Sequence, residues 1–262
     1  MKKVLILLAA VCVVSAMAEN TVLHVIDFET SEGYSAGELL GQNGWYSIYS
    51  GNGRQEIVND PTTAPSGSQY ATYNKENTGD GPNTAVKFDI SGSYVAGNKL
   101  LISWDQAGST AQDSYVKLHN LGASGKNYDV EIAEIIMYKS PSTYAAISVT
   151  KSDKSGTLTK GVDVGDNTVF HHFTLLIDPS DRTIKEYTVD GNVIDDIAGT
   201  YYKNEWDSIK PSKPTARGGD LIDGVRFMNR GSFDNFKVEM VPEPAVFGLI
   251  ALLGLFFARK QR

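Results

Sequence analysis

The stretch His171-His172-Phe173-Thr174-Leu175-Leu176-Ile177-Asp178, followed by a turn at 179–182 and by Thr183-Ile184-Lys185-Glu186-Tyr187-Thr188-Val189, decides the fold class. Each of the two segments has the composition and length of a β-strand, and the short linker between them is rich in turn-forming residues. Asp190-Gly191, a favoured two-residue hairpin turn, then leads into Asn192-Val193-Ile194. The pattern predicts two consecutive antiparallel hairpins.

The same composition recurs on both sides of this stretch. Short segments rich in Val, Ile, Tyr, Phe and Thr alternate with polar positions and are separated by Gly, Asn, Asp and Ser. Strands are expected at residues 22–29, 84–90, 99–106, 114–119, 130–138, 144–150, 168–178, 183–189, 224–229 and 233–240. Between the two ends of the chain, only residues 204–209 suggest a helical turn. The sequence therefore predicts an all-β protein, a sandwich of two antiparallel sheets.

Three stretches carry a resemblance to known sandwiches. The hairpin resembles the paired strands of concanavalin A-like lectin and laminin-G-like domains, in which a His-rich strand, a turn and a Val-Asp-Gly turn recur. Asp27-Phe28-Glu29 leading to Gly41-Gln42-Asn43-Gly44-Trp45, and the closing Phe233-Asp234-Asn235-Phe236-Lys237-Val238, are similar to exported bacterial jelly-roll domains. The resemblance implies one concanavalin A-like jelly roll over residues 19–240.

The C-terminal end has three parts in a fixed order: Val241-Pro242-Glu243-Pro244, 14 apolar residues at 245–258, and Arg259-Lys260-Gln261-Arg262. As a helix the apolar run would span roughly 21 Å, which makes a marginal membrane anchor. The cations Arg259, Lys260 and Arg262 would hold its end in the cytoplasm.

This end resembles the bacterial PEP-CTERM sorting tail over residues 241–262. The resemblance implies transient insertion of the helix in the inner membrane and recognition of Pro242, Glu243 and Pro244 by an exosortase-type enzyme. The helix would then be removed or replaced, which places the product on the cell surface or in the extracellular matrix of a Gram-negative-type bacterium. The alternative is a plain C-terminal transmembrane anchor that follows a proline-rich linker.

The N-terminal end predicts a signal peptide over residues 1–18. Lys2 and Lys3 precede an apolar core of 11 residues at 4–14, and Ala16 and Ala18 form an A-x-A-like cleavage site. The core is too short for a membrane anchor, so we expect export by the Sec machinery. Cys12 is the only cysteine, so the exported chain has neither disulfides nor cysteine metal sites.

Charge excludes one class of partner. The chain carries 24 basic and 31 acidic residues, and five of the basic ones lie in the two end segments. The remaining body is acidic and has no cluster of cations, so nucleic acid is not expected as a partner.

The two ends of the sandwich suggest a cation site. First and last strands often pair in such folds, which would bring Asp27 and Glu29 near Asp234 and Asn235. Oxygen ligands of this kind suit a structural Ca²⁺, which would stabilise a domain without disulfides. The alternative is that these are ordinary strand-end and turn residues.

The segment Asp129-Val130-Glu131-Ile132-Ala133-Glu134 is the candidate for catalysis. Strand alternation places Asp129 and Glu131 on one face and Glu134 on the other, and only a bulge would align all three. The segment faintly resembles the carboxylate strand of laminarinase-type glycoside hydrolases, but that family has the order Glu, Asp, Glu. We therefore expect no enzymatic activity; if there were any, Glu131 and Glu134 would carry it.

Carbohydrate binding is the expected function, because aromatic rings stack on sugar faces while polar neighbours hydrogen-bond the hydroxyl groups. The candidates gather in two clusters, although each aromatic residue could instead pack in the core: Trp45, Tyr46 and Tyr49; Tyr201, Tyr202 and Trp206. A purely structural or adhesive matrix protein and a laminarinase-like hydrolase remain alternatives.

Overall fold

A computed structural model describes residues 19–47, 55–73, 83–120, 130–139, 141–150, 157–200 and 221–242. The expected signal peptide, the turn at 204–209 and all of the C-terminal tail beyond Pro242 lie outside these residues. No helix in the described ranges is long and apolar enough to cross a membrane.

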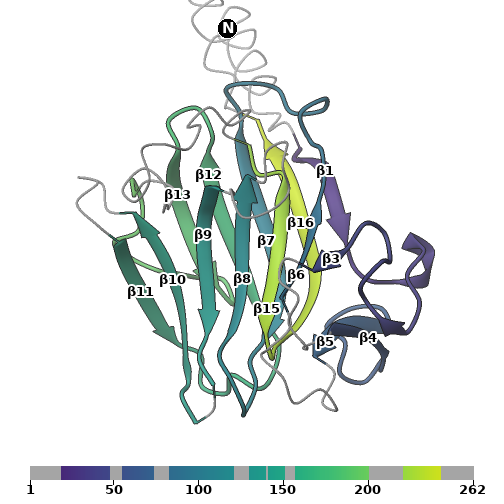
Figure 1. Cartoon of the computed structure of the whole chain (residues 1–262). Coiled ribbons are helices and arrows are strands. Elements are labelled where there is room, and N and C mark those ends of the chain that lie inside the picture. Colours follow the sequence, from purple (N-terminus) through teal and green to yellow (C-terminus); the bar gives the residue numbers. More distant parts are fainter. Residues whose placement is uncertain are drawn as a thin grey trace, which may run out of the picture.

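The described strands form two antiparallel sheets that pack face to face (Figure 1). The first sheet has nine strands, in the order β14 (Asn192–Val193), β13 (Thr183–Val189), β12 (His171–Asp178), β7 (Lys99–Ala107), β16 (Ser232–Val241), β5 (Gln69–Tyr73), β4 (Gln55–Asn59) and β2 (Gly37–Glu38), with β1 (Thr21–Ile26) also paired to β16. The second has seven strands, in the order β11 (Thr157–Asp163), β10 (Tyr144–Thr150), β9 (Val130–Met137), β8 (Ser114–Asn120), β15 (Gly224–Asn229), β6 (Asn83–Lys87) and β3 (Tyr46–Ser47). The sequence prediction of a two-sheet antiparallel sandwich is confirmed.

The two consecutive hairpins predicted from residues 171–194 are present. β12 pairs with β13, and β13 pairs with β14 across the turn at Asp190 and Gly191. Both turn residues have positive φ, 50° and 76°, as a tight primed turn requires. Each of the ten expected strands is found, with shifts of a few residues at its ends.

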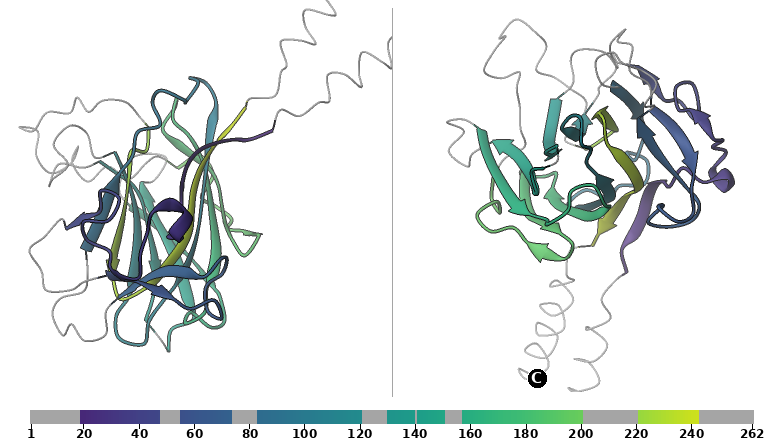
Figure 2. Two further views of the ribbon diagram at one scale, coloured as in Figure 1. Left: turned by 90° about the vertical axis from the view of Figure 1, so that its right-hand side faces the viewer. Right: turned by 90° about the horizontal axis from the view of Figure 1, so that it is seen from below.

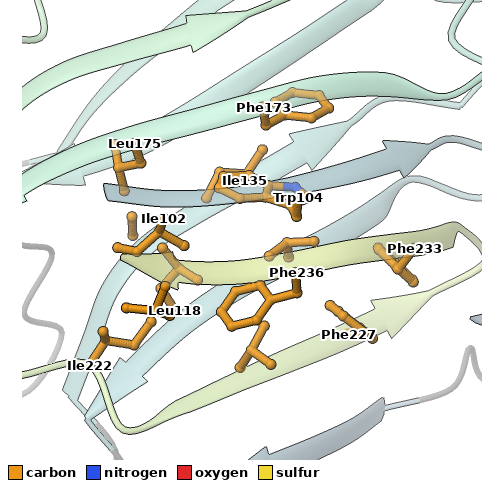
Figure 3. Close-up of a cluster of buried hydrophobic side chains, with 14 of the residues drawn as sticks. Ile102, Trp104, Leu118, Ile135, Phe173, Leu175, Ile222, Phe227, Phe233 and Phe236 are labelled. Carbon is orange, nitrogen blue, oxygen red and sulfur yellow. The ribbon is translucent and has the colours of Figure 1, made fainter. Parts of the chain in front are cut away.

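The core lies between the sheets and is rich in aromatic side chains (Figure 3). Trp104 stacks on Phe173 with ring centroids 5.4 Å apart, and Phe227 stacks on Phe233 at 4.2 Å. These four side chains are fully buried. Trp104 and Phe173 come from the nine-stranded sheet, and Phe227 from the seven-stranded sheet stacks across the core on Phe233 from the other, so the stacking joins the two layers.

The first and last strands pair, as expected from the resemblance. Thr21 lies opposite Met240, and Ile26 lies opposite Phe236. The start of β1 and the end of β16 therefore lie side by side at one end of the sandwich (Figure 2). β16 also has a bulge between Asp234 and Lys237, where Asn235 has a φ of 51°.

Candidate functional site

Charged side chains cross the outer face of the seven-stranded sheet in a single row. Cross-strand register places Arg226 opposite Lys117, and Lys117 opposite Glu134. The adjacent residues Val225, Leu118 and Ala133 belong to the core, so strand alternation turns the charged row outward. We use the name polar row for the register neighbours Tyr46, Ala85, Arg226, Lys117, Glu134 and Ser148.

The polar row offers both hydrogen-bond donors and acceptors. Lys117 and Glu134 form an ion pair, and their side chains are only 12% and 15% exposed. Arg226 donates from Nε to Oδ1 of Asn83 at 2.5 Å. The charges are thus held in place by neighbours on the same face, and partial burial strengthens their fields.

Aromatic and small side chains lie next to the polar row on the same face. Tyr115, Ile136, Ala146 and Gly161 are register neighbours across four strands. Burial, together with nearby acidic groups, raises the pKa of the Tyr115 phenol. Half-exposed Tyr144 packs its ring against Gly161, where an added Cβ would meet the ring at 3.1 Å. This face therefore combines aromatic surface, the small residues Ala146 and Gly161, and polar groups that are held in place by their neighbours.

The candidate catalytic strand has an irregular register. Glu134 lies opposite Lys117, whereas Glu131 lies opposite His119, and the register shifts between Leu118 and His119. The shift marks a β-bulge in β9. Without it, regular strand alternation would place positions 131 and 134 on opposite faces of the sheet. Asp129 lies outside the described residues.

The aromatic candidates for glycan contact differ in where the structure places them. Trp45 is 2% exposed and donates from Nε1 to the Tyr34 hydroxyl at 3.0 Å, so its interpretation as a glycan contact is wrong: the ring belongs to the core, where apolar packing dominates. Tyr46 lies at the β3 end of the polar row, half-buried. Tyr49, Tyr201, Tyr202 and Trp206 lie outside the described residues.

Acidic side chains also gather around the bulge of β16. The Glu29 carboxylate accepts hydrogen bonds from the Ser68 and Gln69 amides at 2.6 and 2.8 Å, and Asp27 accepts one from the Glu29 amide at 3.1 Å. Asn235 donates to Asp105 at 2.5 Å. Asp27, Glu29 and Asn235 are therefore used in local hydrogen bonds around this bulge.

Asp234 differs from these neighbours. It is 1% exposed, and neither of its carboxylate oxygens has a hydrogen-bond partner. Burial, and next the negative charges of Asp105, Asp27 and Glu29, raise its pKa to about 8. Burial also raises the pKa of nearby Glu32 to about 7. Such an arrangement favours a proton or a cation at Asp234.

No group of three or more His, Cys, Asp or Glu side chains in the described ranges is arranged to hold a metal ion. A cation at the bulge would therefore need other oxygens beside the carboxylates, as Ca²⁺ commonly uses. Asp234 fits such a role, since its carboxylate is buried without a hydrogen-bond partner among the described residues.

Sequence reasoning missed Asp105 and His172 beside the bulge. Asp105 accepts from Asn235 through Oδ2 and contacts Nδ1 of His172 through Oδ1 at 2.7 Å, which raises the pKa of that histidine. The alternation of β7 turns Asp105 outward next to buried Trp104, which is the one signal that the sequence offers.

Comparison with known proteins gives similarity of fold alone. No family model matches the chain, and no curated protein matches it. A Bacillus subtilis protein of unknown function with a galectin-like fold is 11% identical, with a TM-score of 0.47, over 87% of this chain and 100% of that one. The laminarinase catalytic domain from Thermotoga petrophila is 12% identical, with a TM-score of 0.45, over 86% and 99%. The laminarinase from Rhodothermus marinus is 10% identical, with a TM-score of 0.44, over 86% and 99%.

One sequence prediction is corrected by these likenesses. The sequence predicts no enzymatic activity, but catalytic domains of laminarinases are among the solved structures that the chain resembles. The prediction that the chain has no enzymatic activity is therefore withdrawn. At about 10% identity the fold does not decide which activity is present.

Proposed function

We propose that the chain is an exported cell-surface or extracellular-matrix protein whose β-sandwich binds a polysaccharide on the outer face of the seven-stranded sheet. The polar row is the observation that carries this proposal. Lys117, Glu134 and Arg226 hold charged donors and acceptors in fixed positions on a face that also exposes Tyr144.

Sugar recognition needs these two kinds of surface together. Aromatic faces remove the apolar side of a sugar ring from water, while fixed polar groups replace the hydrogen bonds of its hydroxyls with water. The ion pair and the Arg226 contact hold the polar groups before binding, which lowers the entropy lost when a ligand is ordered. No perturbed pKa is required for binding alone.

Sorting rests on the two end segments of the sequence. The signal peptide at 1–18 would direct export, and Pro242, Glu243 and Pro244 with the apolar run and the basic tail would direct an exosortase-type enzyme. A structural or adhesive matrix protein would carry the same end segments without affinity for a glycan.

We also propose a structural Ca²⁺ near the β16 bulge. Asp234 would supply the charge, and the remaining ligands would be oxygens other than the carboxylates of Asp27 and Glu29, because these three acidic side chains are not arranged as one metal site. The unpartnered, buried carboxylate of Asp234 supports this proposal, because a divalent cation would offset both its desolvation and the repulsion from its acidic neighbours.

Glycoside hydrolysis is the second candidate. The register shift in β9 favours it, since this bulge changes the relation between positions 131 and 134. A retaining mechanism needs two carboxyl groups about 5 Å apart, one of them protonated. The Glu134 carboxylate is already held in an ion pair with Lys117 on this face, which supports the binding role.

Affinity electrophoresis distinguishes polysaccharide binding, glycoside hydrolysis and a purely structural role. The domain comprising residues 19–242 is run through gels that contain different polysaccharides, with and without Ca²⁺, and each polysaccharide is assayed for released reducing sugar. Retardation without release would support the binding role. Release of reducing sugar that is lost in Glu134→Gln would establish hydrolysis. Unretarded migration in every gel would favour a purely structural role.

A further inference from the structure

The last strand of the sandwich ends close to the expected membrane segment. β16 continues to Val241, and the apolar run begins at Ala245, so only three residues separate the sheet from the expected membrane segment. Fully extended, this link spans at most roughly 14 Å. The headgroup layer is about 5–8 Å thick on each side of a bilayer. The last residues of β16 therefore cannot lie far from the headgroups while the tail is inserted.

The side chains at this end agree with that position. Val22 is 52% exposed and follows Thr21, which pairs with Met240. Val95 is 58% exposed, and its amide donates to the Met240 sulfur at 3.3 Å. The loop that carries Val95 is thus fixed to the end of β16, and both valines expose apolar surface beside the exit of the chain.

Charged side chains of both signs lie at this end of the sandwich, including exposed Asp89 in the segment before Val95. Half-buried Lys99 begins β7 opposite Val241 and adds a cation. The neighbouring turn after β12 carries Asp178 and Asp181, and both contact Lys185, at 3.5 and 2.7 Å. Small apolar side chains next to a cation suit the interfacial region of a bilayer.

We propose that the face formed by Val22, Val95, Lys99 and Met240 lies against the lipid headgroups while the C-terminal segment is in the membrane. This rests on the membrane insertion that the proposed function includes. The strands then rise from the membrane, the polar row faces sideways, and Pro242, Glu243 and Pro244 are confined between the sandwich and the bilayer. A processing enzyme must reach this motif from the side or after the sandwich tilts away.

The test uses single cysteines, because the exported chain has none of its own once Cys12 is removed. Val95→Cys is labelled with an environment-sensitive fluorophore in the full exported chain, in vesicles of phosphatidylethanolamine and phosphatidylglycerol that contain a spin-labelled lipid. Val169→Cys is the matched control, since Val169 is 50% exposed and precedes β12 at the opposite end of the sandwich. We expect the lipid to quench the label at position 95 and to leave the label at position 169 unchanged.

Equal quenching at both positions in chains that float with the vesicles would overturn the proposal, and insertion would still stand. Chains that do not float with vesicles would instead contradict membrane insertion itself. A flexible Gly/Ser linker of about 12 residues, inserted between Val241 and Pro242, should abolish the quenching at position 95 by releasing the tether. Quenching that survives the longer linker would contradict the tether as its cause.

Discussion

Gly67 shows how one residue without a side chain shapes the acidic end of the sandwich. Its φ is +61°, and a Cβ added there would meet Oε1 of Glu29 at 2.2 Å. The Glu29 carboxylate is fixed at that point by the amides of Ser68 and Gln69, so it cannot move without losing both hydrogen bonds. A residue larger than glycine would therefore disturb the 27–29 segment.

We expect Gly67→Ala to lower the free energy of unfolding by about 1–3 kcal/mol more than Gly97→Ala. Gly97 also has a positive φ, +93°, but an added Cβ would have no neighbour within 4 Å. Its variant therefore measures backbone strain alone. Urea denaturation followed by circular dichroism checks the difference, and equal losses in the two variants would show that the contact with Glu29 is of no consequence.

The sequence alone left the positions of Asp234 and Trp45 open. Asp234 stands in a strand with ordinary alternation in the sequence, yet the bulge and the segments around Glu29 bury it. Trp45 lies in a Gly- and Asn-rich stretch that favours a surface position, yet it packs in the core with Phe28 and Phe227. Both outcomes depend on contacts between distant segments, which local patterns do not contain.

At the scale of elements, the strands with a strong apolar signal were predictable, whereas β2, β3, β4, β5 and β11 were not. β7, β12 and β16 combine alternation with several large apolar residues, and the turn between β13 and β14 has the favoured Asp-Gly sequence. β2 and β3 have two residues each, which is too short for any period. β11 alternates only between exposed and half-buried positions, so its apolar signal is weak.

Asp190 tests how the turn after β13 is tied to the start of β12. Its carboxylate contacts Nδ1 of His171 at 2.6 Å and accepts from the His172 amide at 2.8 Å. Asp190→Ala should lower the free energy of unfolding by about 2 kcal/mol, because a charged hydrogen-bonding group is lost. Asp190→Asn keeps an acceptor and tolerates the positive φ, so it should cost about half as much. Chemical denaturation that shows equal costs for both variants would contradict the importance of these contacts.

At the scale of the whole molecule, the raised pKa values of Asp234 and Glu32 make stability depend on pH. Each group keeps its proton in the folded protein at pH values where the unfolded chain has lost it. The free energy of unfolding therefore falls as pH rises from about 4 to about 8. The raised pKa of His172 acts in the same direction, because its stabilising contact with Asp105 is lost as the ring deprotonates.

We expect a lower melting temperature at pH 8 than at pH 5 in the presence of a chelator, and a smaller difference in Asp234→Asn. Ca²⁺ should raise the melting temperature at pH 8 in the unaltered protein and have little effect on this variant. Thermal unfolding followed by circular dichroism measures the three conditions in both proteins. An unaltered pH dependence in Asp234→Asn would show that this carboxyl is not the cause, and equal responses to Ca²⁺ would place any cation elsewhere.

The polar row is also a property of the whole molecule. Arg226, Lys117 and Glu134 are far apart in the sequence and become neighbours only through the strand order β15, β8, β9. The sequence could name Glu134 from a local motif, but it contained no signal that joins it to Lys117 or Arg226. Sheet order depends on long-range pairing, which a single sequence does not specify.

The most direct measurement of the central claim compares the polysaccharide affinity of two lysine variants by affinity electrophoresis. Lys117 pairs with Glu134 on the seven-stranded sheet, and Lys185 pairs with Asp181 on the nine-stranded sheet. Lys117→Ala should weaken retardation by about tenfold, the equivalent of one charged hydrogen bond, while Lys185→Ala should migrate like the unaltered domain. A polysaccharide that retards the unaltered domain and the folded Lys117→Ala variant equally would contradict binding at the polar row.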